Sequence, residues 1–303
     1  MITIKKILCP VDFFSASDRA VDYATGLAAN YDSAMHLLHV VPPIVPTAYE
    51  YPVALADMVK SVEDAAWREM NKLVAKVKTA GVAVEGEVRT GDVHDEIKRT
   101  IAAAKPDLVV MGTHGRRTVE RWFMGSTAER LLRHCPVPLV TMTAAGEQPA
   151  AARFSRILVT TDFSAGTPDA LAYAFSVAQE NESRITLLHV IHDIPADVSG
   201  KYRDPLITGV RKELEDLVPA EARNWCEVET RVETGLPYRL ILKILEEEEV
   251  DLLVMNIHGK GMLDRALLGS TAERVVRAAR CPVMLIPPLR KAKPRRKPRV
   301  KAA

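Results

Sequence analysis

The chain repeats its own pattern, and this repetition constrains the fold more than any other feature of its 303 residues. The stretch KKILCPVDF, which begins at Lys5, returns as SRILVTTDF from Ser155. LLHV from Leu37 returns as LLHV from Leu187, and both pairs are 150 residues apart. Because matched features at a constant offset are typical of repeated structural units, the sequence predicts two copies of one fold.

A second set of matches follows at a shorter offset. The hexapeptide GSTAER starts at Gly125 and again at Gly269, 144 residues later, so the second copy lacks six residues somewhere between Val190 and Gly235. The stretch TAAGEQPAAAR is expected to link the copies. The predicted division of the chain is a first domain at 1–145, a second domain at 154–289 and a tail at 290–303.

Each copy alternates short β-branched runs with longer amphipathic stretches, a pattern typical of β–α units around a parallel sheet. Five strands with helices on both faces predict a doubly wound α/β domain, and the second copy repeats the series. In the first copy, strands are predicted at 2–11, 35–41, 82–90, 107–112 and 137–142, and helices at 16–31, 56–79, 93–104 and 127–134.

Composition excludes several classes of protein. No apolar run approaches the roughly 18 uncharged residues of a membrane-spanning helix, and the N-terminal MITIKKILCPVDFF lacks a small-residue cleavage site. We therefore expect a cytoplasmic chain with no membrane span. Because the cysteines form no CxxC pair, we expect reduced thiols in place of disulfides or a zinc site. The four thiols are Cys9, Cys135, Cys226 and Cys281.

The last fourteen residues, RKAKPRRKPRVKAA, contain eight Lys or Arg and no acidic residue. Since the whole chain has a formal net charge of +2, the rest of the chain carries a net charge of −6. A basic run interrupted by proline cannot bury apolar surface and is expected to be disordered. Two interpretations stay open: the tail contacts nucleic acid, anionic lipid or an acidic partner, or it only keeps the chain in solution.

A glycine-containing loop follows the fourth predicted strand. Gly112 and Gly115 lack Cβ, so the backbone can turn sharply and approach a ligand, and Gly125 allows the same just before a helix opens at Ser126. The free N–H groups and the dipole of a helix N-terminus suit a phosphate, and Arg116 adds positive charge. The alternative interpretation is an ordinary β–α loop with a serine at the helix start.

The loop occurs twice but matches no hydrolase signature. Neither a GxxxxGK[ST] loop nor a GxGxxG after the first strand occurs, so the sequence supports neither P-loop hydrolysis nor a dinucleotide site. In the second copy Asn256 replaces the first glycine, and its side chain is expected to project where backbone alone stands in the first copy. His39 and His189, at matching strand ends, are expected to be structural, hydrogen-bonded histidines.

These residues together resemble the universal stress protein family. The resemblance rests on Gly112, Gly115, Gly125 and Ser126 at their spacing, with a first strand ending in PVDF and a second in LLHV. It covers the whole chain outside the basic tail, in the tandem arrangement of that family. It implies two tandem Rossmann-like domains of the adenine nucleotide alpha hydrolase-like type, each with a five-stranded parallel sheet.

The resemblance also implies where ATP would bind in the nucleotide-binding branch of the family: across the strand ends, with the base near the first two strands and the phosphates on the glycine loop. In the first copy the candidate residues are the implied positions and two neighbouring loop residues, a histidine and an arginine. They are Pro10, Val11, Asp12, Val40, Met111, Gly112, His114, Gly115, Arg116, Gly125, Ser126 and Thr127. In the second copy they are Thr160, Thr161, Asp162, Val190, Met255, His258, Gly259, Gly269, Ser270 and Thr271.

Some roles within this set stay open. Asp12 and Asp162 could orient ribose hydroxyls or hold Mg²⁺ with phosphate oxygens, or they could simply form a turn after the strand. For His114 and His258, a place beside the phosphates and a structural role are equally expected. The sequence predicts no catalytic residue. It also predicts no metal site whose ligands all come from the protein.

The function that we expect from this resemblance is ATP binding in the stress response, with nucleotide-dependent conformation or association as the output. One alternative is a slow ATPase or nucleotide-dependent phosphotransferase, which is weakened by the absence of a P-loop lysine and of an evident base. The other is an adaptor that binds no nucleotide and acts through protein partners. Family members pair through the edge of the last strand, which implies a homodimer or an intramolecular pseudo-dimer.

Overall fold

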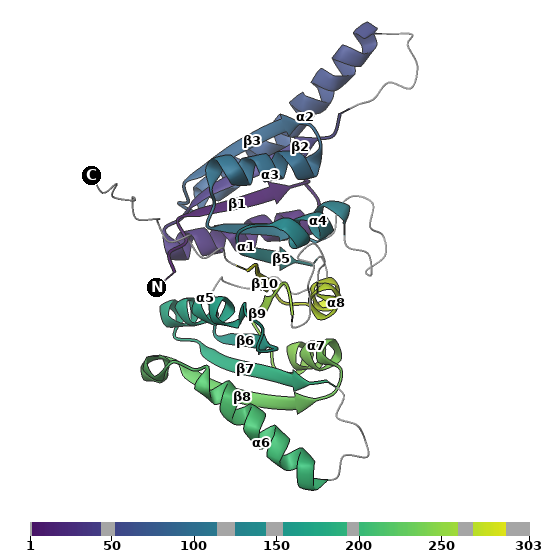
Figure 1. Cartoon of the computed structure of the whole chain (residues 1–303). Coiled ribbons are helices and arrows are strands. Elements are labelled where there is room, and N and C mark those ends of the chain that lie inside the picture. Colours follow the sequence, from purple (N-terminus) through teal and green to yellow (C-terminus); the bar gives the residue numbers. More distant parts are fainter. Residues whose placement is uncertain are drawn as a thin grey trace, which may run out of the picture.

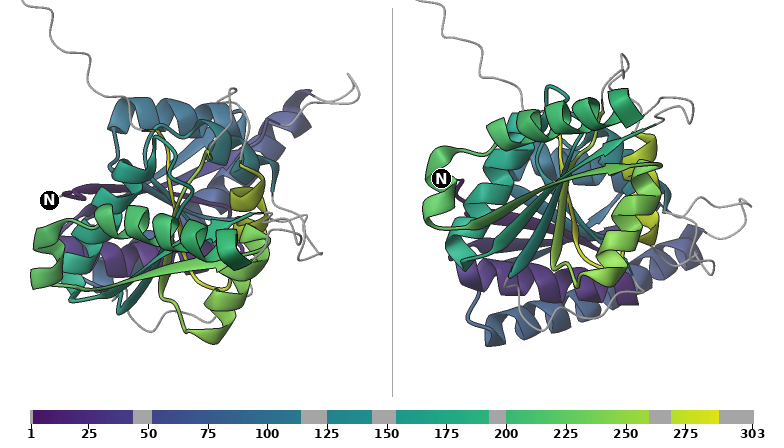
Figure 2. Two further views of the ribbon diagram at one scale, coloured as in Figure 1. Left: turned by 60° about the horizontal axis from the view of Figure 1, so that its bottom comes forward. Right: turned by 90° about the horizontal axis from the view of Figure 1, so that it is seen from below.

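The computed structural model describes residues 2–43, 52–113, 125–143, 154–192, 200–259 and 269–288. In this part of the chain, a twisted sheet is covered by helices on both sides (Figures 1 and 2). The first repeat contains β1 (Lys6–Val11), α1 (Ser15–Tyr31), β2 (Ala34–Val41), α2 (Pro52–Thr79), β3 (Val84–Thr90), α3 (Val93–Ala104), β4 (Leu108–Gly112), α4 (Ser126–His134) and β5 (Leu139–Met142).

The second repeat follows the same order of elements, which confirms the predicted α/β class. A short 3-10 helix, η1, is added before the third strand of this repeat. The elements are β6 (Arg156–Thr161), α5 (Thr167–Asn181), β7 (Arg184–Ile191), α6 (Gly200–Asp216), η1 (Ala220–Asn224), β8 (Glu227–Thr234), α7 (Pro237–Glu247), β9 (Leu252–Asn256), α8 (Ser270–Ala278) and β10 (Val283–Ile286).

The five strands of each repeat are parallel, and the two sets join into one ten-stranded sheet in the order β3-β2-β1-β4-β5-β10-β9-β6-β7-β8. The join is the antiparallel pair β5–β10, with Val140 opposite Met284 at its centre. The sequence predicts a five-stranded sheet in each copy, and the pairing of the last strands joins the two sheets into one. The intramolecular pair that the family resemblance implies is therefore present, while association of whole chains stays a prediction.

Side chains alternate between the two faces of the sheet, as the pleat of a strand requires. In β1, Ile7 and Cys9 face the layer of α1 and α2, and Leu8 faces the layer of α3 and α4. The layers continue across the seam, because α5 and α6 cover the first face and α7 and α8 cover the second. Both repeats therefore share one core on each side of the sheet.

Side chains strengthen the seam between the repeats. The ring of Tyr23 on α1 packs edge-on against Phe154 at a centroid distance of 6.1 Å. Near the N-terminus, the N–H of Ile2 donates to Ser176 Oγ at 2.9 Å, and that hydroxyl donates back to the Ile2 carbonyl at 3.3 Å. The repeats are thus joined by backbone, aromatic and polar contacts.

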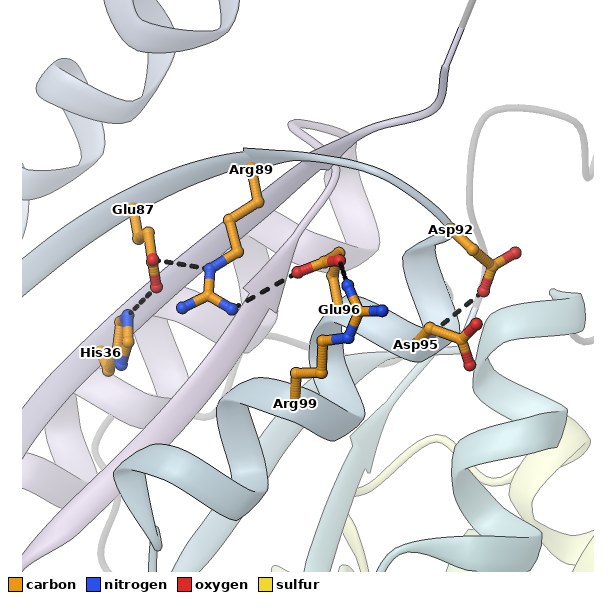
Figure 3. Close-up of polar contacts among 7 residues, drawn as sticks. All are labelled: His36, Glu87, Arg89, Asp92, Asp95, Glu96 and Arg99. Atoms are coloured by element: carbon orange, nitrogen blue, oxygen red, sulfur yellow. Dashed lines mark hydrogen bonds and ion pairs between the residues drawn. The ribbon is translucent and has the colours of Figure 1, made fainter.

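A chain of charged side chains links β2, β3 and α3 in the first repeat (Figure 3). Arg89 donates to Glu87 at 2.6 Å and to Glu96 at 3.4 Å, while His36 contacts Glu87 and Arg99 contacts Glu96. The hydrogen bond to the Glu87 carboxylate raises the pKa of Arg89. These ion pairs hold α3 against β3, the edge strand of the sheet.

Two expectations from composition can be compared with the structure. Cys9, Cys135, Cys226 and Cys281 are free thiols, as predicted. No helix of the described chain has the length and apolar composition that a membrane span would need. The basic tail at 290–303 lies outside the described residues.

Candidate functional site

The candidate site lies where the strand order reverses within each repeat. In the second repeat β6 pairs with β7 on one side and with β9 on the other, so connections leave the carboxyl ends of these strands in opposite directions. Such a switch point leaves a crevice outside the strand ends, where ligands of open α/β sheets bind.

A cavity of about 320 Å³ occupies this place in the second repeat. Its walls come from the ends of β6, β7 and β9 and from the first turns of α7 and α8. The cavity brings together all of the residues that the family resemblance assigns in the second copy: Thr160, Thr161, Asp162, Val190, Met255, His258, Gly259, Gly269, Ser270 and Thr271.

Part of the cavity wall is apolar. Leu188 and Met255 line the cavity from the sheet, Ile241 lines it from α7, and Ile257 follows β9. All four side chains are at most 4% exposed. Sequence reasoning missed Leu188, Ile241 and Ile257, which alternation along β7 and helical spacing in α7 could have suggested. The other walls that it missed are His192, Pro237 and Ala272.

Another part of the wall is the N-terminus of α8. No side chain caps this helix, whose first residues are Ser270 and Thr271. The N–H groups of a first helical turn have no partner inside the helix, and the helix dipole favours an anion in front of them. The arrangement offers backbone donors and two hydroxyls to a negatively charged group.

The glycine before α8 is required by a close approach of the backbone. The Gly269 N–H donates to the Ile257 carbonyl at 3.1 Å, and a Cβ on Gly269 would lie only 3.0 Å from that oxygen. Its φ of −59° is open to any residue. Close packing against the Ile257 carbonyl therefore accounts for a glycine at this position.

Gly259 packs against the carboxylate at the end of β6. A Cβ on Gly259 would lie 2.7 Å from Asp162 Oδ2, while Asp162 Oδ1 accepts the Ser164 N–H at 3.0 Å. Asp12 likewise accepts the Phe14 N–H at 3.1 Å. Both aspartates thus form the expected turn, and Asp162 also reaches the cavity.

Asp12 and His39 lie close together at the end of β1 and β2. Burial raises the pKa of Asp12, although its hydrogen bond from Phe14 and the nearby His39 oppose this shift. Burial also lowers the pKa of His39, against its hydrogen bond to Val11 and the charge of Asp12. Burial therefore makes the charged form of each group less favourable than it is in water.

His39 and His189 have the structural role that we expect from sequence. The His39 Nδ1–H donates to the Val11 carbonyl at 2.8 Å, and its ring stacks on Phe13 with centroids 4.3 Å apart. His189 stacks on Phe163 in the same way at 4.6 Å. Phe13 and Phe163 have φ of 62° and 56°, a region that side chains rarely adopt. Each histidine therefore helps to hold a strained turn beside the site.

Asn256 is among the residues that line the cavity, and its carboxamide faces the start of α5. With the amide turned so that its oxygen and nitrogen match their neighbours, the nitrogen donates to the Gly166 carbonyl at 3.1 Å and the oxygen accepts the Thr167 N–H at 3.2 Å. The alternation of β9 turns the side chain to the α5 face. The expectation that this side chain projects where the first copy has backbone alone stays a prediction.

In the first repeat, the corresponding contact between the end of β4 and the start of α1 is made by two small residues, Gly112 and Ala16. A Cβ on Gly112 would lie 2.8 Å from the backbone carbon of Ala16 and 2.9 Å from its oxygen. In the second repeat, Gly166 stands at the place of Ala16 and Asn256 at the place of Gly112. α1 begins at Ser15, whereas α5 begins at Thr167, two residues later in the repeat.

The other assigned residues of the first repeat lie at the matching edge of the sheet. The Gly125 N–H donates to the Thr113 carbonyl at 3.0 Å, as Gly269 does to Ile257. The residues at this edge are Pro10, Val11, Asp12, Val40, Met111, Gly112, Gly125, Ser126 and Thr127. His114, Gly115 and Arg116 lie outside the described residues. Among the described residues, no three His, Cys, Asp or Glu side chains gather as metal ligands would.

Comparison with known proteins agrees with this architecture. A universal stress protein of Mycolicibacterium smegmatis is 29% identical over 299 residues, which cover 93% of this chain and 97% of that protein. A universal stress protein of Methanocaldococcus jannaschii is 30% identical over 139 residues, which cover 44% of this chain and 82% of that protein.

A solved structure shares the fold of this chain, and a family model matches both of its repeats. The crystal structure of a universal stress protein from Archaeoglobus fulgidus shares the fold, with a TM-score of 0.72 at 23% identity over 96% of this chain and 98% of that chain. The model of the universal stress protein family matches residues 3–142 and 153–287. Because both repeats match along nearly their whole length, the chain belongs to the universal stress protein family.

Proposed function

We propose that the chain binds ATP and acts in the stress response through nucleotide-dependent conformation or association. The observation that carries this proposal is the cavity of about 320 Å³, whose wall combines buried apolar side chains with an uncapped helix N-terminus. Its volume falls within the range of small-molecule sites, which are mostly apolar with a few converging polar groups. A nucleotide has the same division into a flat ring and an anionic chain.

In this proposal the base packs between the sheet and α7, against Leu188, Met255 and Ile241. The phosphates lie at the start of α8, where backbone N–H groups and the hydroxyls of Ser270 and Thr271 donate to them. The first repeat carries the same serine and threonine at the start of α4. The proposal therefore extends to both repeats.

Mg²⁺ would need phosphate oxygens of the nucleotide as ligands in addition to the protein. Asp162 is the single carboxylate among the described residues that line the cavity. One carboxylate together with phosphate oxygens is a usual way for proteins to hold Mg²⁺. Asp162 would therefore hold the ion, and the ion would neutralise phosphate charge. The described wall contains no lysine and no second carboxylate, which supports binding with at most slow hydrolysis.

The test is a matched pair of acidic substitutions, Ser270→Asp and Ser126→Asp. An acidic residue in the first turn is favourable for a helix, so both variants should fold. The new carboxylate would stand where the phosphates bind and repel them. In calorimetric titration with ATP we expect two sites in the native chain, one in each single variant and none in the double variant. Unchanged affinity and stoichiometry in Ser270→Asp would show that the cavity does not bind ATP.

Two further measurements separate this proposal from the alternatives. Mass spectrometry of the denatured, purified protein should detect ATP or ADP that the chain has retained. A hydrolysis assay, with the double variant as the control for contaminating enzymes, should show slow turnover. Turnover of many ATP molecules per minute, lost in the double variant, would favour an enzyme. Association of whole chains, and contact of the tail with nucleic acid or an acidic surface, remain parts of the proposal.

A further inference from the structure

The floor of the cavity contains one hydroxyl in an apolar setting. Thr160 is the second-last residue of β6, and in the pleat it shares a face with buried Leu158. On one side it pairs with Leu188 of β7. On the other side, Met255 of β9 follows the Val159–Val254 pair and so stands next to Thr160. The hydroxyl of Thr160 therefore lies between two apolar side chains that also line the cavity.

The first repeat has no hydroxyl at this place. Pro10 stands at the position of Thr160 and pairs with Leu38, and Met111 stands at the position of Met255. The flanking residues are thus the same types in both repeats. Further along the wall, His192 lines the second cavity where the first repeat has Pro42. Two polar residues of the second cavity wall thus correspond to prolines in the first repeat.

A ligand that covers this floor removes water from the Thr160 hydroxyl. If the ligand offers no partner, the hydroxyl is left without a hydrogen bond, which is unfavourable in an apolar setting. Sites built around a hydrogen-bonding group reject ligands that lack the partner far more strongly than apolar pockets reject an extra atom. The difference between threonine and proline is therefore expected to change what each pocket selects.

We propose that Thr160 determines the specificity of the second pocket, by hydrogen bonding to a polar atom on the edge of the bound base. The first pocket, with Pro10, packs the base without such a bond. This inference rests on the proposed nucleotide binding, because it concerns the base of the nucleotide in the same cavity. It makes the two pockets of one chain unequal in the ligands that they accept.

The test compares Thr160→Val with Thr160→Ser, both in the Ser126→Asp background so that only the second pocket is titrated. Valine keeps the shape of threonine and removes the hydroxyl, whereas serine keeps the hydroxyl. For ATP we expect the valine variant to bind about 5- to 20-fold more weakly, the size of a lost hydrogen bond to a buried group. The serine variant should stay within about threefold of the parent, by the same measure.

The opposite result is equally clear. Valine adds apolar surface to the floor, so if the hydroxyl makes no bond to the base, Thr160→Val will bind ATP as tightly as the parent or more tightly, and the inference fails. If the Ser126→Asp parent itself binds no ATP at millimolar concentration, the proposed function fails for this pocket and the inference fails with it. Urea denaturation of both variants should show that each is folded.

Discussion

Replacing Gly112 with asparagine, the residue that the second repeat carries, should destabilise the first repeat by about 2 kcal/mol, within the usual range for overpacking of a filled core. A Cβ at Gly112 would lie 2.8 Å from the backbone carbon of Ala16. Because the contact is with backbone, a change of side-chain rotamer cannot relieve it. The first turn of α1 would have to shift or unwind, as the later start of α5 at Thr167 suggests.

The second repeat provides the matched change. In Asn256→Gly the carboxamide that donates to Gly166 and accepts from Thr167 is lost. The Thr167 N–H also donates to the Ser164 carbonyl at 3.0 Å, so it keeps a partner when the carboxamide is removed. We expect a cost of about 1 kcal/mol, the usual net contribution of a hydrogen bond. Glycine thus suits this position in the first repeat, and asparagine suits it in the second.

The assay is urea denaturation followed by far-UV circular dichroism, without nucleotide, since a bound ligand would add its own stabilisation. Combining Gly112→Asn with Ala16→Gly recreates the pair of the second repeat and should recover part of the lost stability. A Gly112→Asn protein within about 0.5 kcal/mol of the native chain, the usual size of a neutral substitution, would refute the packing argument. So would a double variant that is no more stable than the single one.

Two other predictions concern charged groups. Lowering the pH from 7 to 5 should reduce the free energy of unfolding more in the native chain than in His39→Asn. Burial holds the pKa of His39 below 6.5 in the fold, so the unfolded chain takes up this proton first as the pH falls; identical pH profiles would contradict this. Arg89→Met should cost about 1 kcal/mol, because Glu87 loses its partner at 2.6 Å while Glu96 keeps only Arg99. The Glu96 side chain is 9% exposed. The exposed pair Lys72–Glu69 is the control, and an equal loss in Lys72→Met would contradict a special role for Arg89.

Much of the fold was predictable because the evidence for it is local and occurs twice. The predicted helix at 93–104 agrees with α3 at both ends, where Asp92 accepts the Asp95 N–H as a cap and Lys105 ends the helix with positive φ. The predicted helix at 56–79 begins earlier, at Pro52, because proline is well suited to the first turn of a helix.

What the sequence did not predict depends on contacts between distant elements. Alternation along β9 and β7 indicates which face Asn256 and Leu188 take, but the hydrogen-bond partners of Asn256 follow from the position of α5, and the place of Ile241 in the cavity wall follows from how α7 lies on the sheet. The positions assigned in the second copy meet in one cavity because the repeat places them at equivalent strand ends. The glycines could be predicted, but the atoms that they approach could not.

The antiparallel seam between β5 and β10 has a consequence for variation. In an assembly of two identical subunits, every substitution appears on both sides of the symmetry axis at once. Here a single polypeptide supplies both sides, so a codon can change in one half while its counterpart stays as it was. Proline at 10 with threonine at 160, and glycine at 112 with asparagine at 256, are differences that an identical pair could not contain.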